Sequence, residues 1–321
     1  MDALGSLLYE VRSDGALFSR NFVTPPWSVR FADRTPLTLI TMLYGTGWVV
    51  PGDDDDGDGV PPVALAQGDV AVVVGPEPFT VTDDADTRRA PLYVVHADHC
   101  TTAGGEDISD DVILGLRTCG TGQDSPTVLL AGGYQVGGRV SERLLSALPR
   151  VVVVPRDGTP APILDLTAAE VGRDAPGQQA VLDRLLDLLL LSTLRAWFDR
   201  PEAKPPGWYR ALGDPVVGRA LRLIHDRPAR SWTVTALAEE AGVSRATFAR
   251  RFTELVGEPP MTYLTGWRLA LAADLLTRTE ATVDSIARQV GYQSAFGLSV
   301  AFKRVHGTRP SEHRAAARQD A

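Results

Sequence analysis

Several features that define whole classes of proteins are missing from this sequence of 321 residues. Its two cysteines, Cys100 and Cys119, are too few for the disulfide framework of a small secreted domain. No basic segment followed by an apolar run opens the chain, so we expect no signal peptide. Apolar runs such as Leu188–Leu191 are far shorter than the roughly 20 residues that span a bilayer. These absences predict a cytoplasmic protein without a membrane partner.

Positive charge is scarce and unevenly distributed. The formal net charge is −8, yet residues 207–321 contain 16 Lys and Arg against 11 Asp and Glu, a balance of +5, which leaves −13 for residues 1–206. Almost all of these cations are arginines, whose planar fork suits phosphate and guanine. The chain is long enough for two domains. The charge therefore predicts an acidic N-terminal part and a C-terminal part that polyanions attract.

A short pattern occurs twice between Thr233 and Arg314. Each copy has apolar residues at helical spacing, then a glycine, then a second apolar helical run and a closing Gly-x-x-Pro. The two glycines, Gly242 and Gly291, are 49 residues apart, and the offset after them is 50 because Gln293 adds one residue. Apolar residues at helical spacing, broken by a glycine that adopts positive φ easily, predict two helices joined by a tight turn. A single copy is compatible with a plain helical hairpin, but two copies in register predict a duplicated helix-turn-helix.

The first copy predicts a helix with a basic face. Thr233 and Ser244 are expected to cap its two helices, and the second helix is expected over residues 245–256. Phe248 and Phe252 lie on the apolar face of that helix, and the opposite face has three arginines. A helix of this kind, presented by a short turn, is the arrangement that enters the major groove of DNA.

These motifs make residues 214–314 similar to the DNA-binding domain of AraC/XylS-type transcription regulators. The matching segments are Ser244–Phe252, Gly257–Pro260, Tyr263–Leu264, Trp267–Arg268, Ile286–Ala287, Val290–Tyr292, Ala301–Lys303 and Gly307–Pro310. The resemblance implies an all-α domain with two helix-turn-helix units and a function in sequence-specific transcription regulation. It also implies double-stranded promoter DNA as a partner, and RNA polymerase as a further candidate partner.

The resemblance also indicates the DNA-contacting residues. In the first unit they are Arg245, Ala246, Thr247, Ala249, Arg250 and Arg251; in the second they are Gln293, Ser294, Ala295, Gly297, Lys303 and Arg304. Arg250 can reach a guanine edge, whereas Arg245 and Arg251 are expected to hold phosphates. On the exposed turn of the second unit, which includes Phe296 and Val300, only Gln293 can make bidentate hydrogen bonds. We therefore predict that the second unit positions the protein more than it reads sequence. Arg268 and Arg288 remain open as surface charges or phosphate contacts.

The N-terminal half has the pattern of an all-β domain. Short segments rich in β-branched residues, such as Leu37–Tyr44 and Val70–Val74, alternate with Gly- and Pro-containing turns, which is typical of a sandwich or barrel. The order of strands around Gly68-Asp69 and the Gly75–Pro78 turn resembles the cupin barrel of one AraC-type subgroup. We expect short helices at residues 1–8 and 141–148. The acidic run Asp53–Asp58 is expected to be a solvated loop, because it lacks the spaced ligands of a calcium loop.

Enzymatic cupins hold a metal through a His-x-His pair, a carboxylate and a later His. The first motif region here, Leu43–Trp48, contains no His, and Phe79 occupies the later family His position. Without those ligands we expect no metal-dependent enzyme and no cofactor. The barrel is instead expected to bind a small effector, whose identity the sequence does not specify.

His96, His99, Cys100 and Cys119 form the only cluster with ligand chemistry. They can hold a transition metal, or the two cysteines can form a redox disulfide. Alternatively, this is an ordinary loop, and Cys119 acts as a small apolar residue. A thiol-based redox- or electrophile-responsive regulator is therefore the alternative function.

Residues 177–200 predict one long helix that is apolar on more than one side. One face can lie on the barrel, and a second copy of the chain is the expected partner of the other; burial between the domains of one chain is the alternative. The expected organisation is a sensor and dimerisation domain at 1–200, a proline-rich linker at 201–213 and a DNA-binding domain at 214–321.

Overall fold

The computed structural model describes residues 11–12, 18–52, 60–86, 89–97, 99–115, 117–136, 145, 148–158, 161–200, 203 and 205–319. The expected helix at 1–8 and loop at 53–58 lie outside these residues, as does most of the expected helix at 141–148. Val11–Val136 and Leu148–Lys204 form one compact unit, and the chain from Pro205 onward belongs to a second. No helix among the described residues is long and apolar enough to cross a membrane.

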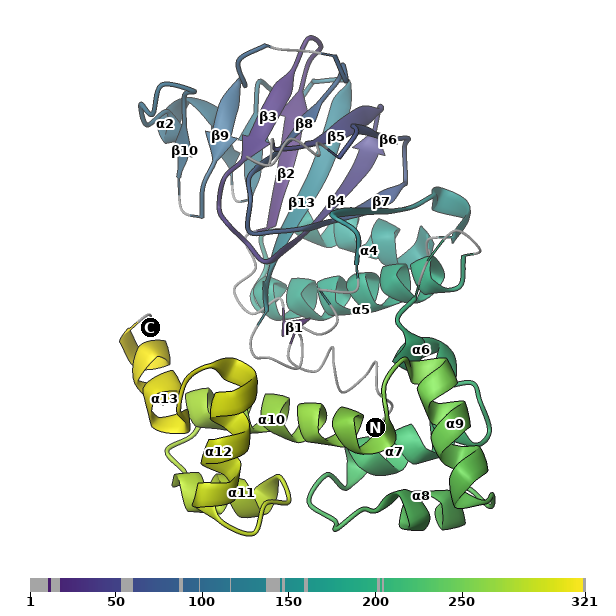
Figure 1. The fold of residues 1–321 in the computed structure, drawn as a ribbon. Helices are drawn as coiled ribbons and strands as arrows, with labels where there is room; N and C mark the ends of the chain where they lie inside the picture. The colour runs from purple at the N-terminus through teal and green to yellow at the C-terminus, as the bar shows by residue number, and fades with distance from the viewer. Residues whose placement is uncertain are drawn as a thin grey trace. The chain divides into compact units, whose positions relative to one another are not determined.

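Two sheets make up most of the first unit (Figure 1). The larger has the strand order β11-β12-β2-β13-β4-β7-β14, with β1 paired to β13. Its strands are β1 (Val11–Arg12), β2 (Phe18–Val23), β4 (Leu37–Tyr44), β7 (Val70–Val74), β11 (Ile113–Gly115), β12 (Thr118–Gly120), β13 (Thr127–Val136) and β14 (Val151–Val154). The smaller has the order β10-β9-β3-β8-β5-β6. Its strands are β3 (Ser28–Phe31), β5 (Gly47–Pro51), β6 (Val63–Leu65), β8 (Phe79–Thr82), β9 (Tyr93–Val95) and β10 (Cys100–Thr101).

The core of this unit lies between the two sheets. One cluster of buried residues draws Ile40, Ala71 and Leu129 from the larger sheet and Val29 and Phe79 from the smaller. Side chains alternate between the two faces of a strand, so each strand contributes every second residue to this layer. The β-rich fold expected from the spacing of strands and turns is confirmed. A short helix, α2 (Ser109–Val112), lies between β10 and β11, and a 3₁₀ turn, η1 (Arg156–Gly158), follows β14.

Two helices complete the first unit and lie side by side in Figure 1. Helix α5 (Gln178–Phe198) matches the long helix expected at 177–200. The phenol of Tyr134 on β13 donates a hydrogen bond to the carbonyl of Leu186 at 2.8 Å, which attaches α5 to the larger sheet. Helix α4 (Ala161–Val171) was not predicted from the sequence, although its buried Leu164 and Val171 lie seven residues apart, as two helical turns require.

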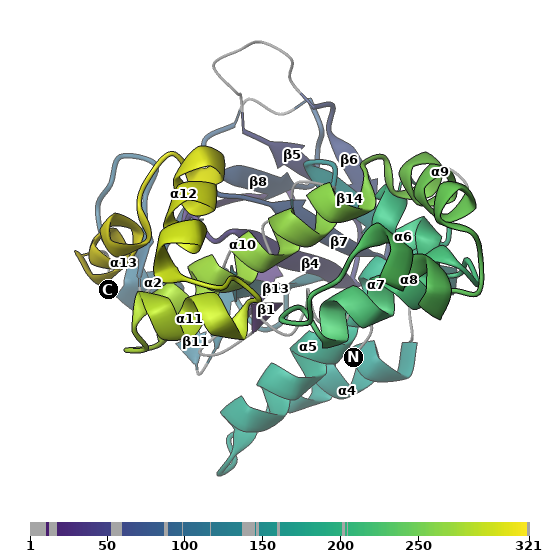
Figure 2. The ribbon, with the colours of Figure 1, turned by 60° about the horizontal axis from the view of Figure 1, so that its bottom comes forward.

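The second unit is entirely helical among its described residues. Its elements are α6 (Gly207–Ala211), α7 (Val217–Asp226), α8 (Val234–Glu240), α9 (Arg245–Val256), α10 (Pro260–Arg278), α11 (Val283–Gln289), α12 (Ala295–His306) and α13 (Pro310–Gln319). Figures 1 and 2 show α9 and α12 near opposite ends of α10. Helix α10 therefore separates two helix-turn-helix units, α8–α9 and α11–α12.

The structure places a short helix within the expected linker at 201–213. Helix α6 occupies residues 207–211, and Trp208 and Ala211 are buried in the helical unit. Gly207 lies so close to α9 that an added Cβ would come within 2.5 Å of the Leu255 carbonyl oxygen. The prolines and glycine suggested an extended linker, but helix α6 packs against α9 and belongs to the second unit.

Candidate nucleic-acid interface

Local signals position the first recognition helix, α9. The hydroxyl of Thr233 accepts a hydrogen bond from the Ala236 N–H at 3.1 Å at the start of α8, and the Ser244 hydroxyl accepts one from the Thr247 N–H at 3.2 Å at the start of α9. Gly242, with φ of 71°, makes the turn between them. Each of these features was predicted from the sequence, because caps and turns depend on residues close together in the chain.

One face of α9 is buried and the other faces solvent. Phe248 and Phe252 have no exposed surface. Of the six predicted contact residues on this helix, Arg245, Ala246, Thr247, Arg250 and Arg251 are exposed and Ala249 is half-buried. The structure thus brings the predicted contact residues of the first unit together on one helix surface.

The three arginines of α9 differ in what they already bind. Among the described residues, the Arg245 guanidinium has no ion pair, and Arg250 makes an exposed pair with Glu254 at 3.0 Å. Arg251 donates from Nε at 2.9 Å and from Nη2 at 2.5 Å to one oxygen of Asp214. The other Asp214 oxygen accepts hydrogen bonds from the N–H groups of Val216 and Val217, both at 2.9 Å, at the start of α7. Arg251 therefore attaches α9 to α7, a role that the sequence did not indicate.

The electrostatics of Asp214 agree with this attachment. Burial alone would raise the pKa of its carboxyl, but the hydrogen bonds from Arg251 and from the two backbone N–H groups outweigh burial, so the pKa is lower than usual. The carboxylate is thereby kept charged as a partner of Arg251.

The second unit repeats the same construction. Thr282 accepts a hydrogen bond from the Ser285 N–H, and Ser294 accepts one from the Gly297 N–H, both at 3.2 Å. Gly291, with φ of 88°, corresponds to Gly242. Leu298 and Phe302 of α12 are fully buried against α10 and α11.

The predicted contact residues of the second unit also lie together, though less evenly exposed. Gln293, Ser294, Lys303 and Arg304 are exposed, while Ala295 and Gly297 are half-buried. The largest exposed side chain on α12 belongs to Phe296, of which 79% is accessible.

The open question on Arg268 and Arg288 has a structural answer for Arg268. Its guanidinium donates to the carbonyl oxygens of Pro228 and Arg230, each at 2.8 Å, and so holds the loop before α8 against α10. Arg288 is exposed and forms an ion pair with Asp284 at 2.7 Å. Arg268 is therefore built into the fold, whereas Arg288 stays at the surface.

The two cysteines of the first unit lie in contact although they belong to different sheets. The Cys100 thiol on β10 and the Cys119 thiol on β12 are close enough for each to shift the pKa of the other. The interaction with Cys119, together with burial, raises the pKa of Cys100 far above its usual range, and the interaction with Cys100 lowers the pKa of Cys119. Cys119 is thus the better candidate for a thiolate.

The two histidines of the same predicted cluster contact each other. The rings of His96 and His99 stack with centroids 4.5 Å apart, and His96 Nε2 lies 3.1 Å from the Thr101 hydroxyl. Within the described part of the chain, no three His, Cys, Asp or Glu side chains come together as metal ligands.

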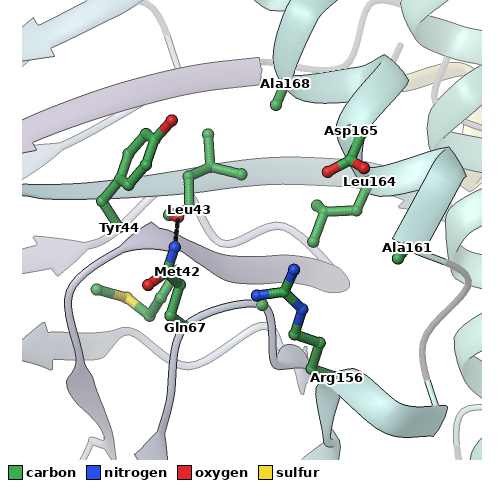
Figure 3. Close-up of a pocket in the computed structure, with 10 residues that line it drawn as sticks. Met42, Leu43, Tyr44, Gln67, Arg156, Ala161, Leu164, Asp165 and Ala168 are labelled. Atoms are coloured by element: carbon green, nitrogen blue, oxygen red, sulfur yellow. Dashed lines mark hydrogen bonds between the residues drawn. The ribbon is translucent and has the colours of Figure 1, made fainter.

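A pocket of about 160 Å³ lies between β4 and α4 (Figure 3). Met42 and Leu164 line its apolar floor and wall, and Tyr44, Gln67, Arg156 and Asp165 supply polar groups. The Gln67 amide is held by the Leu43 carbonyl at 2.9 Å. The pocket is lined by both polar and apolar groups, as small-molecule sites are.

Comparison with known proteins finds a matching family model for each of the two units. The model of a cupin family matches residues 2–199, and that of a helix-turn-helix domain matches residues 237–316. A putative AraC-like transcription regulator from Streptomyces lividans is 36% identical over 319 residues, with 98% of each chain covered. The chain belongs to the AraC-like transcription regulators. A second such protein, from Streptomyces antibioticus, is 35% identical over 320 residues and also covers 98% of each chain.

Solved structures resemble the DNA-binding part of this AraC-like regulator. The DNA-binding domain of the global transcriptional factor AdpA, crystallised with a target DNA, is 32% identical, covers 34% of this chain and 96% of its own, and has a TM-score of 0.32. The family membership confirms the expectation of a DNA-binding transcription regulator with a cupin domain.

Proposed function

We propose that this AraC-like regulator recognises its promoter mainly through α9, while α12 occupies the next major groove. The observation that supports this most directly is the pair of exposed arginines, Arg245 and Arg250, on a capped helix whose opposite face is fully buried. Arg250 is free to exchange its exposed partner Glu254 for a guanine edge, because an exposed i,i+4 pair contributes only about 0.3–0.5 kcal/mol.

The spacing of the two units supports binding to one face of the duplex. Helix α10 has 19 residues and is therefore about 28 Å long at 1.5 Å per residue. Recognition helices at its two ends are separated by a distance comparable with the ~34 Å of one DNA turn. In this proposal Arg245, Arg251, Lys303 and Arg304 hold phosphates, and Gln293 makes the hydrogen bonds to bases in the second unit. The surface of the two helices that comes closest to the DNA consists of Ala246, Thr247, Ala249, Ser294, Ala295 and Gly297.

The cupin unit is proposed to sense a small effector. The pocket of Figure 3 supports this, since α4 forms one wall of it and packs along α5. Helix α5 in turn ends at Phe198, just before the chain enters the helical unit. An effector that favours one position of α4 would thereby change the population of DNA-competent molecules.

Footprinting tests the proposed function. Mapping the genomic sites that the protein binds supplies the promoter, and hydroxyl-radical cleavage on that promoter is expected to reveal two protected segments about 10 base pairs apart on one face. Protection of a single segment, or of segments on opposite faces, would contradict a two-groove complex.

The contact between Cys100 and Cys119 favours a second candidate function, a thiol switch. With hydrogen peroxide as the two-electron oxidant, the Cys119 thiolate attacks one peroxide oxygen and becomes a sulfenic acid, with release of hydroxide. The Cys100 thiol then attacks that sulfur, forms the disulfide and releases water. The bond would join β10 and β12, which belong to different sheets.

Intact-mass spectrometry tests the thiol switch. Wild-type protein treated with peroxide is expected to lose about 2 Da through the disulfide, and promoter affinity is expected to change in parallel. The Cys100→Ser variant is the control, because it should instead accumulate oxygen adducts on Cys119. Unchanged mass, or unchanged affinity after full disulfide formation, would exclude the switch.

A further inference from the structure

The exposed face of α12 contains a large apolar side chain with no covering. Phe296 is 79% accessible, and Val300, one turn further along, is 55% accessible. Other phenylalanines of the same unit, Phe248, Phe252 and Phe302, have no accessible surface at all. Solvated apolar surface of this kind is costly for the free protein, so its presence on a recognition helix indicates that it is covered in the bound state.

The position of Phe296 identifies what covers it. It lies in the first turn of α12, two residues after the Ser294 cap, at the end of the helix that a helix-turn-helix inserts toward base edges. Lys303 and Arg304 are exposed in the last turn of the same helix. A helix with an apolar side chain in its first turn and cations in its last turn fits a groove whose floor is partly apolar and whose walls are phosphates.

The duplication makes the comparison with α9 direct. The 50-residue offset places Phe296 at the position of Ala246 and Val300 at the position of Arg250. The second unit therefore has apolar surface where the first has a guanidinium. The apolar group that B-DNA presents in the major groove is the C5-methyl of thymine.

We propose that Phe296, supported by Val300, reads thymine methyl groups in the half-site under α12. This inference rests on the proposed two-groove complex. It adds to the expectation that the second unit positions the protein more than it reads sequence: bidentate hydrogen bonds to bases are limited there to Gln293, and apolar contact with methyl groups adds sequence preference. The half-site under α12 is accordingly rich in thymine at one or two positions, and the half-site under α9 contains the guanine.

Replacing single thymines by uracil removes only the methyl group and tests the proposal. On the promoter defined by footprinting, wild-type protein is expected to lose roughly 4- to 10-fold in affinity at one or two thymines of the second half-site. Phe296→Ala is expected to bind the unmodified site with a similar loss, and to be insensitive to uracil at those positions. Val305→Ala is the matched control, because Val305 is 53% accessible on the same helix but lies near its other end. It should keep the full response to uracil.

Two outcomes would overturn the proposal. If uracil has no effect at any thymine of that half-site, Phe296 does not read methyl groups. If Phe296→Ala binds DNA like wild type but loses transcriptional activity, the exposed face docks on a protein such as RNA polymerase. The footprint separates this failure from failure of the two-groove complex, because protection of both segments places α12 in its groove whatever Phe296 does.

Discussion

Replacing Arg245 and Arg250 together with alanine is expected to weaken promoter binding by roughly 30- to 1000-fold, since a bidentate guanine contact contributes about 1–3 kcal/mol and a phosphate contact adds to it. Affinity for the specific duplex should fall more than affinity for a scrambled duplex, because Arg250 reads a base. The slope of log affinity against log salt should also become shallower by about 1 for each phosphate contact that is lost. Fluorescence anisotropy with specific and scrambled duplexes across a salt titration measures both quantities.

The design of this variant separates binding from folding. Both arginines are exposed, and the side chain of Arg250 is 70% accessible, so thermal stability should change little. Arg173→Ala is a matched control, because Arg173 is 66% accessible and makes a similar short-range pair with Glu170 at 3.2 Å, but lies in the cupin unit. It should bind DNA like wild type. Equal affinity and equal salt slope for the double variant and wild type would remove α9 from the interface.

The helix-turn-helix units were predictable because their signals are local. Thr233, Ser244 and Ser294 cap helices within three residues of themselves, and Gly242 and Gly291 form turns that need positive φ. A cap or a turn depends on neighbouring residues, so the sequence pattern contains most of the relevant information. The helical spacing of apolar residues also predicted that the arginines of α9 are exposed.

Contacts between distant segments were not predictable in this way. The pairing of Arg251 with Asp214 joins residues 37 positions apart, and Arg268 holds carbonyls 38 and 40 positions away. The contact of Cys100 with Cys119 depends on the register of strands in two different sheets. In each case tertiary packing decides which side chains meet, and a single sequence contains no local pattern that predicts such contacts. Helix α6 was missed for a related reason, since it packs on α9, which lies much further along the chain.

A substitution on the outer face of α5 is expected to convert a dimer to a monomer. Along α5, Leu182, Leu186 and Leu189 are buried in the cupin unit, but Val181 and Leu188 are each 46% accessible and Leu185 is half-buried. Spacings of four and three residues place Val181, Leu185 and Leu188 on one stripe of the helix. We propose that a second copy of α5 covers this stripe, because a two-fold axis brings the same helix surface of both copies together and buries both.

The double variant Val181→Asp, Leu188→Asp tests the dimer. Each side chain is about half covered already, so burying the rest of it stabilises the dimer by roughly 1 kcal/mol. Both copies of each side chain lie in the two-fold interface, so each contributes twice. The dimer dissociation constant should therefore rise about 1000-fold or more, since about 4 kcal/mol is lost and the introduced carboxylates repel each other. Sedimentation velocity over a range of concentrations measures this change.

Leu92→Asp provides the control for general surface effects. Leu92 is 37% accessible and precedes β9 in the other sheet, away from α5 in the sheet order. This variant should sediment as wild type does. If the α5 variant stays dimeric, the stripe is not the interface. If it becomes monomeric and still protects both promoter segments with unchanged affinity, dimerisation does not contribute to recognition, and the paired recognition helices of one chain account for binding by themselves.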